Sequence, residues 1–152
     1  MQTIPQILQS ASVRSQDYPR APRQGVFLTA ANQLIGSYNA LTRFRATHPA
    51  YTGWEAHHIV EARDLDRLGI ARQFPVYEEQ ISVLIPKAAH ADRINSILNR
   101  HNPAGMVVNT QFLKQAYKDA YSVIGDYCGG GEKPIRDELM SIVAAVFRAG
   151  GV

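Results

Sequence analysis

Apolar side chains that recur every three or four positions predict helices in several stretches of the chain. The first is expected over residues 27–46, where one helical face would carry Phe27, Ala31, Leu34, Ile35, Tyr38, Leu41 and Phe44. The same spacing predicts helices over 88–99, 109–124 and 134–148. A shorter, polar helix is expected over 61–68, ending at Gly69.

Two short runs of mostly apolar residues predict strands, one over 54–60 and one over 81–85 that ends at Pro86. Residues 74–76 are expected to be extended, because Pro75 disfavours helix in the residue before it. The two strands can pair antiparallel, with the next helix folding back across them. The predicted class is therefore α+β: a two-stranded antiparallel hairpin plus a helix, surrounded by additional α-helices and mostly helical overall.

Composition divides the chain into an arm and one domain. Residues 1–25 are polar and contain three prolines, which predicts a basic, partly disordered arm or linker with at most one short helical turn. Residues 26–152 are expected to form the single domain that a chain of 152 residues can support. No apolar run approaches the roughly 20 residues that cross a bilayer. No signal peptide is evident, and a piece of a larger exported protein would look the same.

Charge adds a weak indication of a partner. The net charge is +3, and residues 1–50 carry five arginines against one aspartate. These arginines could meet phosphates or simply lie in solvent, so charge alone does not indicate nucleic acid. The single cysteine, Cys128, excludes an internal disulfide and a cysteine-rich zinc site.

The most informative stretch is Trp54-Glu55-Ala56-His57-His58-Ile59-Val60-Glu61, which places two adjacent histidines in an apolar run. A third, His90, follows the second predicted strand. Histidine is the commonest metal ligand and the usual general base near neutral pH. Neighbours on a regular strand point to opposite faces, but a strand end can bring both to one site. A histidine pair can also be purely structural; with His90, it suggests a metal-dependent nuclease.

Residues 51–100 resemble an HNH nuclease of the ββα-metal (His-Me finger) class, as in colicin-type DNases and the C-terminal nuclease domains of bacterial polymorphic toxins. The matching features are Glu55-Ala56-His57-His58-Ile59-Val60, then Gln80-Ile81-Ser82-Val83-Leu84-Ile85-Pro86, then His90. The resemblance implies a small ββα-metal core. It also implies that His57 and His90 bind a divalent metal ion and that His58 is the general base.

Two positions depart from that family pattern. Gln80 stands where the family has an asparagine that braces the loop and orients the base, so Gln80 is a candidate for that role. Ile94 stands where the family often has another ligand. Asn95, one residue off the best face of the helix, and His101, near its end, are candidates to complete the metal shell.

The resemblance implies a largely sequence-nonspecific endonuclease acting on double-stranded DNA. Arg63 and Arg93 are candidate phosphate contacts, with a solvated helix face as the alternative for each. The metal stays open among Mg²⁺, Zn²⁺ and Ni²⁺. It further implies a monomeric toxin domain, secreted as part of a larger antibacterial effector, that acts in the target-cell cytoplasm and is blocked by a cognate immunity protein. Two alternatives remain: an RNase on the same scaffold, and a non-catalytic module that binds metal or nucleic acid.

Overall fold

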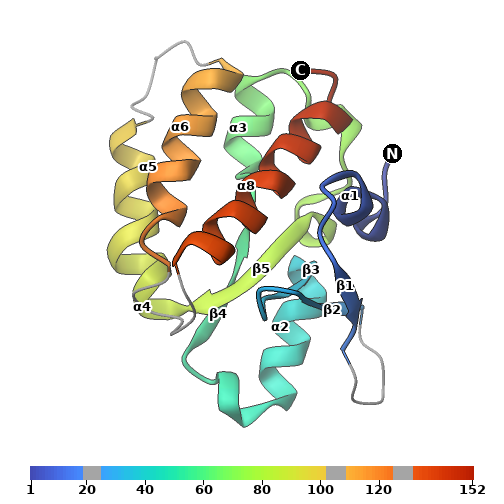
Figure 1. Ribbon diagram of the computed structural model, residues 1–152, viewed down its shortest axis with the longest axis vertical. Coiled ribbons are helices and arrows are strands. Elements are labelled where there is room, and N and C mark those ends of the chain that lie inside the picture. The colour runs from blue at the N-terminus through green and yellow to red at the C-terminus, as the bar shows by residue number, and fades with distance from the viewer. Residues whose placement is uncertain (19–24, 102–108, 125–131) are drawn as a thin grey trace.

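The computed structural model describes residues 1–18, 25–101, 109–124 and 132–152, without the side chains of residues 92, 93, 100, 101, 132 and 133. The fold is α+β, 56% helical, with a five-stranded antiparallel sheet (Figure 1). The strand order is β1-β2-β3-β5-β4. The strands are β1 (Ser15–Asp17), β2 (Val26–Thr29), β3 (Leu34–Ser37), β4 (Trp54–His58) and β5 (Ile81–Pro86).

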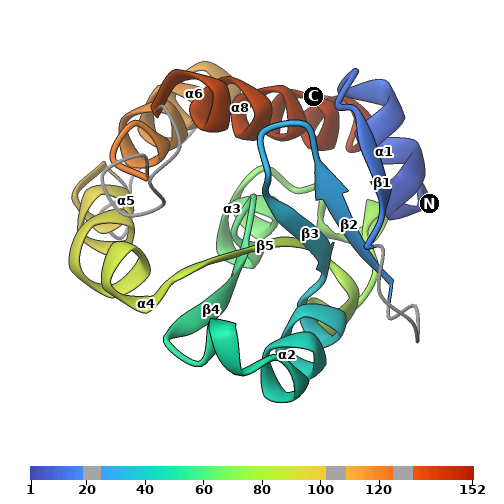
Figure 2. The same ribbon diagram turned by 60° about the horizontal axis from the view of Figure 1, so that its bottom comes forward.

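Helices cover both faces of the sheet (Figure 2). One face carries α2 (Tyr38–Thr47), and the other carries α1 (Ile4–Ser10), α6 (Thr110–Tyr121) and α8 (Glu132–Ala149). The shorter helical elements are Pro49–Tyr51, α3 (Ala62–Arg67), Ala71–Gln73, Tyr77–Glu79, α4 (Lys87–Ala89), a π-helix (His90–Ile94) and α5 (Asn95–His101). Among the described helices, none is both long and apolar enough to cross a membrane.

Strand β5 is buried on both faces, because it separates two hydrophobic cores. Val83 and Ile85 belong to the larger core, which includes residues of α6 and α8. Leu84 belongs to the smaller core, with Leu41 and Phe44 of α2. Successive strand residues point to opposite faces, so a strand between two cores must be apolar at nearly every position. This explains why residues 81–85 are apolar except for Ser82.

The helix expected over 27–46 is wrong in its first part, where the chain forms the β2–β3 hairpin instead. Its turn places Asn32 at φ 61°, and the Thr29 hydroxyl accepts a hydrogen bond from the Gln33 N–H at 3.1 Å. Helix α2 starts only after Ser37, whose hydroxyl caps it by accepting from the Ala40 N–H at 3.0 Å. The predicted two-stranded hairpin is likewise corrected, because β1, β2 and β3 extend β4 and β5 into a five-stranded sheet.

The expectation of an arm over residues 1–25 does not hold for residues 4–17. Thr3 and Gln6 form a capping box that starts α1. Ile7 and Leu8 are 3% and 1% exposed in the larger core, and β1 pairs with β2. Residues 19–24 lie outside the described part of the chain.

The other predicted elements are confirmed with small shifts in their ends. Both strands around the histidines are present, and α3 is followed by Gly69 at φ 72°, a left-handed conformation that glycine adopts without steric cost. Helices α6 and α8 match the predictions over 109–124 and 134–148. The helix predicted over 88–99 is present, but a π-helical turn interrupts it.

Candidate active site

A cavity of about 290 Å³ lies at the end of β4, between α3, the Tyr77–Glu79 turn and the helical segment after β5. Strand β4 is at the edge of the sheet, so side chains from its two faces can reach one cavity around that edge. His57 pairs with Val83 and faces α6, whereas His58 pairs with Ser82 and faces the start of α2. The cavity is lined by His57, His58, Glu61, Arg63, His90 and Asn95, among others.

His58 is held so that one ring nitrogen remains free to accept a proton. Its Nε2 lies 2.8 Å from the carbonyl oxygen of Tyr77, and a carbonyl only accepts, so Nε2 carries the hydrogen and Nδ1 the lone pair. The Tyr38 ring stacks on the imidazole with a centroid distance of 4.9 Å. Burial lowers the pKa of His58, against the opposing effects of the Tyr77 carbonyl and the Glu78 carboxylate. A neutral imidazole with a free Nδ1 is what a general base requires.

His57 is also held as a neutral ring, by a tyrosine of α6. The Tyr121 hydroxyl donates its hydrogen to the carbonyl oxygen of Ile59. It must therefore accept from His57, whose Nε2 lies 3.1 Å away, and this leaves the lone pair on Nδ1. Burial, with smaller effects from the neighbouring His90 and His58, lowers the pKa of His57 to about 3. The ring is thus uncharged at neutral pH, the state in which imidazole binds a metal.

His90 is oriented by a carboxylate from the neighbouring strand. Its Nδ1 lies 2.8 Å from Oε2 of Glu55, so in the neutral ring Nδ1 carries the hydrogen and Nε2 the lone pair. The rings of His57 and His90 are 4.9 Å apart between centroids, at an angle of 62°. Among the described residues, no group of three or more histidine, cysteine, aspartate or glutamate side chains could hold a metal ion.

The π-helical turn after α4 brings Asn95, rather than Ile94, beside His90. The Asn95 N–H donates to the carbonyl oxygen of His90, five residues back, where a regular α-helix would use a residue four back. Ile94 is fully buried in the larger core. Asn95 lines the cavity with His90. The sequence pattern placed Asn95 off the best face because it assumed regular helical geometry.

Gln80 is not among the residues that line the histidine cavity. Its Nε2 donates to the carbonyl oxygen of Pro75 at 3.1 Å, across the loop that carries Tyr77. The group bonded directly to His58 is the Tyr77 carbonyl. The Gln80 side chain therefore bonds to the loop that supplies this carbonyl, and its hydrogen bond does not involve the imidazole.

Two of the remaining candidates have side chains outside the described part of the structure, Arg93 and His101. Arg63 lines the cavity, and its Nε lies 3.2 Å from Oε2 of Glu61. Its side chain is 38% exposed, so the guanidinium is partly open to solvent. Burial raises the pKa of Glu61, while Arg63 opposes that shift.

Two tyrosines on α6, which were not among the residues predicted for the site, join this helix to the end of β4 and the start of α3. The Tyr117 hydroxyl accepts from the Glu61 N–H at 2.8 Å and donates to the buried carboxylate of Asp64. Tyr121, one turn later, holds His57 and the Ile59 carbonyl. The i, i+4 spacing of Tyr117 and Tyr121 was the available signal, but it did not reveal their partners.

The donors at the cavity suit a divalent metal ion with an incomplete protein shell. His57 and His90 each have one ring nitrogen held by a protein partner, and Asn95 lines the same cavity. Imidazole with oxygen donors suits Zn²⁺, Ni²⁺ and similar ions, with water or substrate oxygens in the remaining positions. No protein-family model, curated protein or solved structure matches this chain.

Proposed function

We propose that this protein is a metal-dependent endonuclease of the HNH type that hydrolyses DNA phosphodiester bonds with little sequence preference. The observation that carries the proposal is the hydrogen bonding of the three histidines at one cavity. Each has one nitrogen committed to a protein partner, and in the neutral ring its other nitrogen is free. The pairing of β4 with β5, followed by the helical segment that begins at Lys87, supports a ββα-metal core within the larger sheet.

His58 is the proposed general base. Its Nδ1 takes a proton from water, the water oxygen bonds to phosphorus, and the bond from phosphorus to the leaving oxygen breaks. The Tyr77 carbonyl keeps the other nitrogen protonated, so Nδ1 stays available. Such a base contributes about 10²–10⁴-fold to the rate.

His57 and His90, with Asn95, are the proposed metal-holding residues. A bound divalent ion would stabilise the charge that develops on the phosphate and on the leaving oxygen. Tyr121 and Glu55 fix the two rings, as hydrogen-bonding partners of metal-binding histidines commonly do. Arg63 is a proposed phosphate contact, and its Nε lies 3.2 Å from Oε2 of Glu61.

The wider biological role is proposed from the resemblance of residues 51–100 to the nuclease domains of bacterial polymorphic toxins. The protein would be the toxic C-terminal domain of an antibacterial effector, secreted as part of a larger chain and active in the target-cell cytoplasm. A cognate immunity protein would block it in the producing cell. Co-expression with the neighbouring open reading frame of its own genome should relieve toxicity if that frame encodes the immunity protein.

Cleavage of supercoiled plasmid tests the proposed activity. The purified protein should nick and linearise plasmid with Mg²⁺, Ni²⁺ or Zn²⁺, and EDTA should abolish the reaction. His58→Ala should lower the rate at least about 100-fold while retaining the fold and most of the metal affinity. Parallel reactions with total RNA separate a DNase from an RNase on the same scaffold.

His48→Ala is a matched control for the loss of an imidazole. Like His58, His48 stacks on an aromatic ring and bonds through a ring nitrogen to a backbone carbonyl, that of Phe44, at 2.8 Å. It lies away from the cavity, so its removal should leave cleavage unchanged. A His58→Ala protein that cuts plasmid as fast as the parent would falsify the mechanism. Binding of metal or nucleic acid without cleavage of either substrate would indicate the non-catalytic module.

A further inference from the structure

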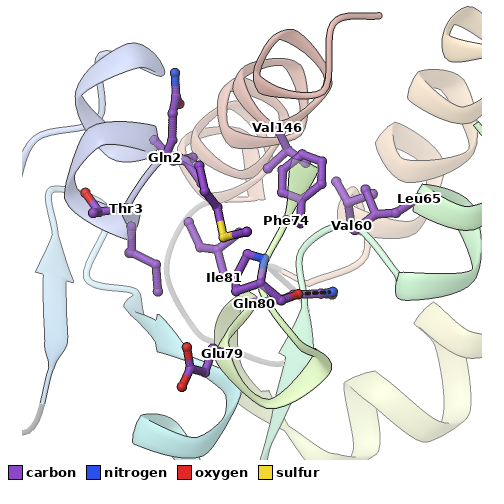
Figure 3. A pocket seen from close by; sticks show the side chains of 13 residues that line it. Gln2, Thr3, Val60, Leu65, Phe74, Glu79, Gln80, Ile81 and Val146 are labelled. Carbon is purple, nitrogen blue, oxygen red and sulfur yellow. Dashed lines mark hydrogen bonds between the residues drawn. The ribbon is translucent and has the colours of Figure 1, made fainter. Parts of the chain in front are cut away.

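The loop that leads into β5 uses its apolar side chains in two different ways. Phe74 packs against the larger core and lines a second cavity, of about 250 Å³, together with Val60 and Val146 (Figure 3). Val76 and Tyr77 follow in the same loop, but they are 66% and 49% exposed. Phe74 therefore contributes to the folded core, whereas Val76 and Tyr77 leave much of their apolar surface in water.

This exposure is unusual for the protein, and it occurs beside the candidate active site. Among the described residues, the only other large apolar side chains that are exposed are Met1 and Val152, the first and last residues of the sequence. Tyr77 also lines the histidine cavity, so an accessible aromatic ring stands at the cavity wall. Two adjacent apolar side chains that folding leaves in water, next to a polar cavity, indicate a surface that contacts a ligand.

The position of the Tyr77 ring is fixed by contacts with the site itself. Its centroid lies 4.2 Å from that of the His58 ring and 5.3 Å from that of the Tyr38 ring. Its backbone carbonyl accepts a hydrogen bond from Nε2 of His58 at 2.8 Å. The ring is thus held in place before a ligand binds, which lowers the entropy cost of binding.

We propose that Val76 and Tyr77 form a stacking surface for an unpaired base of the nucleic acid that is cut at the histidine cavity. The proposal rests on the proposed nuclease function. Glu78 and Glu79 follow Tyr77 and are both exposed, and their carboxylates repel phosphate, so this surface suits an uncharged base better than the backbone. Inside a duplex each base face is covered by its neighbours, so the preferred substrate is single-stranded or locally unpaired.

Binding in EDTA at one salt concentration tests the stacking surface without any cleavage. An oligothymidylate and a strand of equal length made of abasic deoxyribose phosphates carry the same charge, but only the first has bases. By fluorescence anisotropy, the full chain should bind the oligothymidylate about tenfold more tightly, the size of effect expected when one base stacks on an aromatic ring. Tyr77→Leu keeps the apolar bulk without the ring and should abolish this difference, whereas Tyr77→Trp should retain it.

Tyr51→Leu is the matched control, because Tyr51 is a partly exposed tyrosine that contacts the rings of Phe44 and Trp54 and does not line the cavity. It should leave the difference between the two strands unchanged. Equal affinities for the two strands in the parent would overturn the proposal, and this comparison needs no substitution. A Tyr77→Leu protein that retains the difference would also overturn it, and would leave the surface to a protein partner.

Cleavage of plasmid, measured separately, distinguishes this proposal from the proposed function. A parent protein that cuts plasmid but binds both strands equally keeps the nuclease function and loses the stacking surface. A parent protein that prefers the strand with bases, through Tyr77, but cuts no nucleic acid keeps the stacking surface and loses the nuclease function.

Discussion

Mild acid should destabilise this fold, because His57 resists protonation in the folded protein but not in the unfolded chain. Burial holds its pKa at about 3, against 6.5 for an exposed histidine. Between these values the unfolded state binds the proton more readily, so stability falls as the pH drops below 6.5 and the loss levels off near 3. Each pKa unit is worth about 1.4 kcal/mol. At about pH 4.5, roughly two units below the unfolded value, the expected loss is about 3 kcal/mol.

The loss of unfolding free energy can be measured by urea unfolding in EDTA, followed by circular dichroism at about pH 7.5 and about pH 4.5. The parent is compared with His57→Gln. Glutamine keeps an N–H for the Tyr121 hydroxyl but does not titrate. The variant should therefore lose about 3 kcal/mol less than the parent between the two pH values. His58, with its lowered pKa, acts in the same direction, and Glu61, with its raised pKa, acts in the opposite one. Both are present in both proteins, so they largely cancel in the comparison.

An equal pH dependence in the two proteins would refute this reasoning. So would an NMR titration in which the His57 ring of the folded protein gains its proton near 6.5. Either result would mean that burial and the Tyr121 hydrogen bond do not keep the ring neutral.

Four further predictions concern individual contacts. Glu55→Gln keeps an acceptor for His90 but removes the charge, and should weaken Zn²⁺ binding about 10–100-fold by calorimetry; unchanged affinity would exclude a supporting role for Glu55. Tyr121→Phe leaves the His57 N–H and the Ile59 carbonyl without their partner, and should cost about 1–3 kcal/mol in urea unfolding; a neutral effect would contradict the hydrogen bonds described. Because burial lowers the pKa of His58 below 6.5, cleavage at saturating metal should rise with pH and reach half its maximum below pH 6.5. A rate still climbing above pH 8 would argue for another base. Gly69→Ala, at φ 72°, should cost about 1 kcal/mol by thermal or urea unfolding, and no loss would mean that the turn relaxes.

Hydrophobic periodicity predicted the helices that have one buried face and failed over 27–37, where a hairpin strand lies between two cores. Strand β5 also lies between two cores, but its mostly apolar run identified it. Over 27–46 the apolar positions fit a helical stripe, yet Leu34 and Ile35 are adjacent strand residues buried in different cores. A pair of neighbouring apolar residues fits both a helix stripe and a strand that is buried on two faces. The deciding feature is local, the turn at Asn32, and its Ala30-Ala31-Asn32-Gln33 sequence is not a strong turn signal.

The three histidines of the candidate site could be predicted from the sequence, but the groups that orient them could not. His57, His58 and His90 could be named from their types and spacing. The partner of His58 is a backbone carbonyl, which no side-chain pattern reports. The partner of His57 is Tyr121, 64 positions away, and it becomes a neighbour only when α6 packs beside β4. The partner of His90 is Glu55, 35 positions away, and the sequence alone did not assign that pairing.

The π-turn between His90 and Asn95 has a consequence for how this chain should be aligned with others. A π-turn is equivalent to one extra residue in an otherwise α-helical segment. Residues before it and after it therefore belong to two helical registers that differ by one position. In an ungapped alignment, the residue that lines the cavity in a homologue with a regular helix would be matched with Ile94. Its structural equivalent in this chain is Asn95. A homologue that lacks the extra residue should be aligned with a single-residue gap between positions 90 and 95.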